Sequence, residues 1–158
     1  MKVVLILILC ATIYVPGITQ QFSKTVYYET LKKGSLKEIN NQLTIIDAAT
    51  ISNKDAFKGT LLMKKAGSVS VPKQKLDLFK SGRIKLETEI KNDSANTEFH
   101  FLRLIIQEHA PKTVKYSTNI NSDVVIIRSN YKNLSVELQK IIMDYSQTSK
   151  YLKPLDIN

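Results

Sequence analysis

The chain has 158 residues, a formal net charge of +9 and a single cysteine, Cys10. One cysteine excludes an internal disulfide and a cysteine-ligated metal site, and the length suits one domain with its own hydrophobic core. The lysines are spread along the sequence, without a dense block or interleaved aromatic residues. We therefore expect no nucleic-acid binding, and only a weak attraction to anionic surfaces.

The first twenty residues have the pattern of a secretory signal peptide. Lys2 precedes an apolar run from Val3 that continues to Val15, and Pro16 and Gly17 then end the run. A positive start, a short apolar stretch and a breaker before small residues are typical of such signals, and the run is shorter than the roughly 20 apolar residues of a membrane span. The sequence thus predicts a signal peptide at 1–20 and export to the periplasm or the extracellular space.

Cys10 leaves a second interpretation of this segment open. A bacterial lipoprotein carries an acylated cysteine just after its apolar run, but a small residue normally precedes that cysteine and Leu9 stands here. Acylation at Cys10, or retention of the segment, would tether the protein to a membrane. After ordinary cleavage the mature domain, 21–158, has no cysteine, and we expect no transmembrane helix in it.

The remaining sequence predicts helices almost throughout. A first helix covers 25–33 and ends at Gly34, and Ser35 with Glu38 forms a capping box that begins the second helix. The apolar residues of this second helix recur at helical spacing and form one stripe. The stripe consists of Leu36, Ile39, Leu43 and Ile46.

The centre of the chain predicts two further helices and a turn. One helix covers 55–66 with inward-facing Ala56, Phe57, Leu61 and Met63, and Gly67 stops it before a loop at 68–72. The next covers 73–91, and a turn rich in capping residues follows at 92–96. Its helical stripe consists of Leu76, Phe79, Arg83, Leu86 and Ile90.

Three helices are expected in the last third. The first covers 97–109 and is apolar on most sides, which is typical of a central helix, and Pro111 ends it. A polar connection at 112–119 leads to the other two. Their stripes are Ile120, Val124, Ile127 and Tyr131, then Leu134, Leu138, Ile141 and Tyr145. The fold class predicted is all-α, with six or seven helices in a single domain.

The segment 55–107 resembles the tetratricopeptide repeat. In the first helix a large residue, Phe57, stands near Gly59, and in the second helix Gly82 stands where that repeat has a small residue that lets the partner helix approach. Ser94 replaces the proline of the family's turn, and the loop at 68–73 is longer than the family's. The resemblance implies antiparallel helical hairpins.

A second resemblance covers about 27–148. It is carried by the segments 86–90, 92–93 and 98–103, with Gln107, 110–111 and Tyr116. These are similar to a family of uncharacterised exported helical proteins of Bacteroidetes type, although His100 and Lys115 depart from its pattern. The resemblance implies a repeat-like helical fold and export, and it implies no reaction.

The sequence contains no catalytic or metal-binding motif that we can identify. His100 and His109 lie two and a half turns apart on one predicted helix, so they face opposite sides and cannot share a metal ion. We expect both to be surface or partly packed side chains. No serine stands in a nucleophile elbow, and no phosphate-binding loop is present. We therefore expect no enzymatic activity, no cofactor and no metal.

Arg103 is the residue with the clearest alternative roles. It lies among apolar neighbours, and a guanidinium beside a core needs a charged partner. A structural ion pair with Glu87, Glu89 or Asp123 would supply that partner. Alternatively, Arg103 would recognise a carboxylate or phosphate on a concave face, aided by Gln107 and Tyr116.

The function expected first is a non-catalytic protein-interaction or scaffold module of the cell envelope, which holds a protein or peptide partner in a groove. The alternative is a small-ligand or lipid carrier. A carrier predicts a cavity of a few hundred cubic ångströms with one or two polar groups, whereas a scaffold predicts a filled core and an exposed apolar groove. An enzyme would require Glu87, Glu98, His100 and Arg103 to converge on one pocket.

Overall fold

The predicted fold class is confirmed by the structure, a computed structural model that describes residues 21–154. The predicted signal peptide lies outside these residues. The described part contains seven α-helices and two short 3₁₀ turns and has no strand. The helices are α1 (Lys24–Lys33), α2 (Leu36–Ala48), α3 (Lys54–Ser68), α4 (Pro72–Asn92), α5 (Thr97–His109), α6 (Ile120–Asn130) and α7 (Val136–Ser146), with η1 (Lys112–Val114) and η2 (Tyr131–Asn133).

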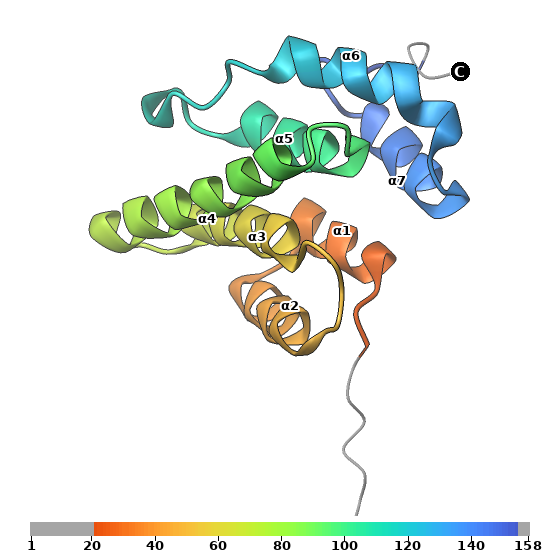
Figure 1. Cartoon of the computed structure of the whole chain (residues 1–158). Helices are drawn as coiled ribbons and strands as arrows, with labels where there is room; N and C mark the ends of the chain where they lie inside the picture. Colours follow the sequence, from red (N-terminus) through yellow and green to blue (C-terminus); the bar gives the residue numbers. More distant parts are fainter. Residues whose placement is uncertain (1–20, 155–158) are drawn as a thin grey trace, which may run out of the picture.

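The helices stack from α2 at one end, through α3 and α4, to α6 at the other end (Figure 1). α5 is the central helix, as its apolar sequence predicts: ten of its residues are buried, including His100, Arg103 and Gln107. α7 contacts α1, and the ring of Tyr145 on α7 meets that of Phe101 on α5. Because α5 is covered on so many sides, its buried polar residues, which also include Thr97, must find partners within the protein.

Local sequence explains where several helices begin. Ser35 Oγ accepts from the backbone N–H of Glu38 at 3.3 Å, and Glu38 Oε2 accepts from the backbone N–H of Ser35 at 2.6 Å. This reciprocal pair is the capping box that the sequence predicts. The hydrogen bond from the backbone N–H of Ser35 to the carboxylate, followed by the contribution of the Ser35 side chain, lowers the pKa of Glu38. Ser135 caps α7 by accepting from the backbone N–H of Leu138.

α3 and α4 form an antiparallel hairpin that is held by two glycines. A Cβ added at Gly59 would lie 2.5 Å from the carbonyl oxygen of Gly82, and one added at Gly82 would lie 2.4 Å from the carbonyl oxygen of Gly59. The backbones therefore touch, and only glycine fits at either position. A close approach of the two helices at Gly82 is what the resemblance implies, and Gly59 is the residue that it meets.

Two details of this hairpin differ from the sequence prediction. α3 continues through Gly67 to Ser68, because Gly67 is not in a left-handed conformation and the chain turns extended only at Val69. Leu76, which the spacing places in the core, is 47% exposed. The hairpin end that carries it projects beyond α5 and α6, so no third helix covers Leu76 (Figure 1).

No helix within residues 21–154 combines the length and the apolar character of a membrane span.

Candidate functional site

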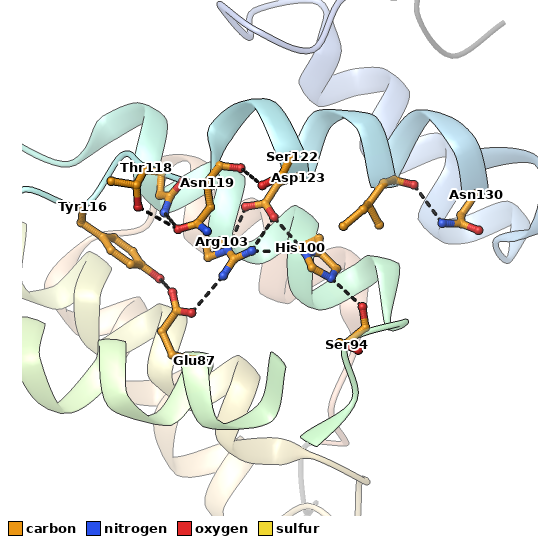
Figure 2. A network of polar contacts seen from close by, with 12 residues as sticks. Glu87, Ser94, His100, Arg103, Tyr116, Thr118, Asn119, Ser122, Asp123 and Asn130 are labelled. Carbon is orange, nitrogen blue, oxygen red and sulfur yellow. Dashed lines mark hydrogen bonds and ion pairs between the residues drawn. The ribbon is translucent and has the colours of Figure 1, made fainter. Parts of the chain in front are cut away.

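Arg103 lies in a cluster of buried polar side chains between α4, α5 and α6 (Figure 2). We call it the Arg103 cluster. Its Nε donates to Asp123 Oδ2 at 2.8 Å, and its Nη2 donates to Asp123 Oδ1 at 2.6 Å. Its Nη1 donates to Glu87 Oε2 at 2.9 Å. Asp123 is fully buried, so this two-point pair joins the centre of α5 to α6, while Glu87 adds α4.

His100 belongs to the same cluster and is only 4% exposed, so the prediction of a surface or partly packed histidine is wrong. Its Nδ1 lies 2.8 Å from Asp123 Oδ1, and its Nε2 lies 3.0 Å from the carbonyl oxygen of Ser94. Both ring nitrogens thus face acceptors, and only the imidazolium form can donate to both, while Nδ1 also lies 3.4 Å from Nη2 of Arg103. Burial lowers the pKa of His100, but the hydrogen bonds to Asp123 and Ser94 outweigh burial and raise it above its ordinary value.

Tyr116 closes the cluster on the side of α4. Its hydroxyl donates to Glu87 Oε1 at 2.5 Å, and the guanidinium of Arg83 lies 4.7 Å from the centre of its ring. The phenol is 2% exposed, and its burial and the contact with Glu87 raise its pKa well above the ordinary value. Glu87 therefore accepts from both Arg103 and Tyr116.

Gln107 lies one turn beyond Arg103 on α5 and contacts other residues. Its Nε2 donates to Asn119 Oδ1 at 3.4 Å, while Asn119 Oδ1 also accepts from Thr118 at 3.0 Å (Figure 2). Gln107 Oε1 is buried without a hydrogen-bond partner in the described residues. Of the three predicted binding residues, the structure therefore joins Arg103 and Tyr116 through Glu87 and leaves Gln107 apart.

Of the four residues whose convergence on one pocket would indicate an enzyme, three share this buried cluster, and none of the three lines the pocket described below. Glu87, His100 and Arg103 meet, whereas Glu98 accepts from Lys24 at 2.6 Å and from the hydroxyl of Tyr28 at 3.2 Å, away from the cluster. When His100 is protonated, the charges of the cluster balance, since Arg103 and His100 then offset Asp123 and Glu87. Such a network stabilises the relative positions of the helices that it joins.

A pocket of about 340 Å³ lies between α1, α5 and α7, on another face of α5. Ile141 and Tyr145, which the spacing predicts in the core, are partly exposed and line it, because Leu138 and Ile142 instead form the buried face of α7. The rest of its apolar lining comes from α1 and α5. These residues are Tyr28, Leu31, Phe101, Ile105 and Ile106.

The acidic side chains that line the pocket all have partners within it or beside it. Glu108 accepts from the hydroxyls of Tyr145 and Ser149 and from the backbone N–H of Tyr151. The other pairs are Glu29 with Lys33, Glu137 with Thr25, and Asp144 with Lys140.

Two lysines of the lining have no such partner. Lys32 on α1 and Lys64 on α3 form no ion pair or hydrogen bond with another described residue. The pocket therefore combines an apolar interior with two lysines that have no such partner and with two carboxylates, Glu108 and Glu137, that are hydrogen-bonded to neutral donors. Sequence reasoning missed this site because its lining comes from four helices that are far apart along the chain.

The part of the chain that the structure describes contains no group of three or more histidine, cysteine, aspartate or glutamate side chains that could hold a metal ion. No family model, curated protein or solved structure gives a significant match to the chain. The resemblances to the tetratricopeptide repeat and to the exported Bacteroidetes-type family therefore stay predictions.

Proposed function

We propose that this chain is a non-catalytic carrier of a small amphiphilic molecule with an anionic head, held in the pocket between α1, α5 and α7. The observation that carries the proposal is this pocket of about 340 Å³. Ligand sites have volumes from roughly 300 Å³ and are mainly apolar, with a few polar groups that fix the ligand's orientation. The apolar part of the ligand would contact Ile105, Ile106 and Ile141.

The charge of the ligand is inferred from the two lysines. Glu29 and Asp144 are paired with lysines, and Glu108 and Glu137 are hydrogen-bonded to neutral donors, so Lys32 and Lys64 are the cations of the lining that a bound anion would meet without displacing an existing contact. A carboxylate or phosphate head supplies that charge. Each such partly exposed contact is worth about 1 kcal/mol or less, so the apolar part of the ligand would supply most of the affinity.

A protein or peptide partner is the second proposal, and it was the first expectation from the sequence. It is weaker here because Arg103, its expected anchor, already donates from all three guanidinium nitrogens to Asp123 and Glu87. An external carboxylate would have to replace a buried internal one.

Export to the periplasm or the extracellular space also stays a proposal, because it depends on residues 1–20.

Isothermal titration calorimetry with three probes tests the carrier proposal: sodium decanoate, decylammonium chloride and decanol. We expect saturable binding of decanoate at one site, weaker binding of decanol and the weakest binding of decylammonium. Ile141→Trp fills the pocket and should abolish binding, whereas Val125→Trp, at a position on α6 that is 58% exposed, should not.

Charge is tested separately with Lys32→Gln/Lys64→Gln, which should weaken decanoate binding by about tenfold and leave decanol binding unchanged. Lys37→Gln/Lys132→Gln is the matched control for the loss of two positive charges. Equal binding of all three probes would contradict the anionic ligand, and binding that survives Ile141→Trp would contradict the pocket.

A further inference from the structure

We propose that the outer face of α4 docks on membrane surfaces that contain anionic phospholipids. This α4 outer face consists of Lys73, Leu76, Lys80 and Ile84, together with Val71 just before the helix. The inference is independent of the pocket, because none of these five residues lines it.

The first observation is exposed apolar surface on one side of a projecting element. Val71 is 56% exposed, Leu76 47% and Ile84 67%. Leu76 and Ile84 lie eight residues apart with Lys80 midway, and spacings of three and four residues place Lys73, Leu76, Lys80 and Ile84 along one side of the helix. This side of α4 begins at the end of the hairpin of α3 and α4, which projects beyond the other helices (Figure 1).

The second observation is the concentration of charge around these apolar side chains. Residues 71–84, which contain the whole face, carry four cationic side chains and one acidic side chain, Asp77, and one of the four, Arg83, lies over the ring of Tyr116. Asp77 pairs with Lys73 at 2.9 Å on the exposed helix surface, and such exposed pairs are weak. Lys75 and Lys80 have no ion-pair partner among the described residues.

Exposed aliphatic side chains set among lysines match the interface of an anionic bilayer. The aliphatic groups enter the boundary between headgroups and acyl chains, while the lysines approach the negative headgroups. A soluble polyanion would satisfy the lysines and leave Val71, Leu76 and Ile84 in water. With only three apolar side chains, the docking is expected to be reversible and to weaken as salt is added.

Co-sedimentation of the protein that begins at residue 21 with lipid vesicles tests the proposal. Vesicles of phosphatidylcholine alone are compared with an equal mixture of phosphatidylcholine and phosphatidylglycerol. We expect binding to the mixed vesicles only, with a loss of about tenfold or more in partitioning for Lys73→Gln/Lys80→Gln. The control Lys37→Gln/Lys132→Gln removes the same charge elsewhere and should lower partitioning much less.

The apolar contribution is tested with Leu76→Gln/Ile84→Gln against Val125→Gln/Val136→Gln, a pair of aliphatic positions on α6 and α7 that are 58% and 82% exposed. The first pair should lower partitioning about fivefold or more and the second should not. All four positions are on the surface, so circular dichroism should report unchanged folding.

Three results would overturn the inference: equal binding to both vesicle types, equal losses in test and control variants, or vesicle binding that is indifferent to Leu76→Gln/Ile84→Gln while heparin is bound as well. The last would assign the surface to a soluble polyanion. Ile141→Trp should leave vesicle binding intact, which separates this test from that of the pocket.

Discussion

Arg103 and Asp123 form a two-point ion pair in which both side chains are buried, with donor–acceptor distances of 2.8 and 2.6 Å. This pair lies where α5 meets α6, and Glu87 extends it to α4. The register of three helices therefore depends on one guanidinium.

Arg103→Met should lower the free energy of unfolding by about 3–5 kcal/mol, because it leaves the buried carboxylate of Asp123 without its main partner. Urea denaturation followed by circular dichroism measures the change. Arg103→Met/Asp123→Leu should be less destabilised than the sum of the two single variants, since it removes both charges. If Arg103→Met were as stable as the wild type, the structural role of Arg103 would be refuted.

The stability of the protein should depend on the protonation of His100. The pKa of His100 is raised in the folded protein, so its protonated form is stabilised by folding. That stabilisation is fully present below the unfolded pKa of about 6.5, and it is lost as the pH rises through the folded-state pKa. His100→Gln should remove this loss.

Urea denaturation at a series of pH values from mildly acidic to alkaline measures the effect. His109→Gln is the matched control, because His109 is exposed and lies outside the cluster. The pH dependence should survive in His109→Gln. A wild-type slope that also survives in His100→Gln would show that another group causes it.

The hairpin of α3 and α4 should tolerate no side chain at its two contact glycines. Gly59→Ala and Gly82→Ala should each lower the free energy of unfolding by about 1–3 kcal/mol or more, because the new methyl group would meet backbone atoms at 2.5 and 2.4 Å. Gly67→Ala is the control, since an added Cβ there has no neighbour within 4 Å. In this helical position alanine should stabilise by about 0.5–1 kcal/mol. Thermal denaturation of the three variants measures these changes. Equal changes in melting temperature in all three would contradict the close approach of the two backbones.

Glu108 should hold the segment that follows α7. Its carboxylate accepts from Ser149 at 2.5 Å and from the backbone of Tyr151 at 3.1 Å, next to Leu152, whose side chain is fully buried. Glu108→Ala should speed hydrogen exchange of the amides at 149–152. Glu29→Ala removes another acid from the pocket rim, one that pairs only with exposed Lys33, and should leave these amides protected. Equal exchange in both variants would exclude this role.

Much of the fold follows from patterns within single helices. The capping box at Ser35 and the apolar composition of 97–109 are local signals, and both predict what the structure contains. The prediction places Leu76 in the core because its spacing is helical. In the structure Leu76 is exposed, because no other helix reaches the end of the hairpin. Spacing shows which residues share a face of a helix, and it cannot show whether a partner covers that face.

The candidate sites were harder to predict, since they depend on contacts between helices. Two of the three proposed partners of Arg103 are correct, Glu87 and Asp123. The role of His100 was missed because its acceptors, Asp123 and Ser94, lie on other segments. A helical stripe also fails to separate Ile141, at the pocket, from Ile142, in the core.

The central claim is that the pocket between α1, α5 and α7 holds the ligand while the Arg103 cluster holds the fold. A methyl-selective nuclear magnetic resonance titration with sodium decanoate tests it most directly. We expect saturable shifts at the methyl groups of Leu31, Ile105 and Ile141, with those of Ile120 and Val124, on α6 beside the cluster, unchanged. Saturable shifts at Ile120 and Val124 without shifts at Ile105 and Ile141, or no saturable shifts at all, would contradict it.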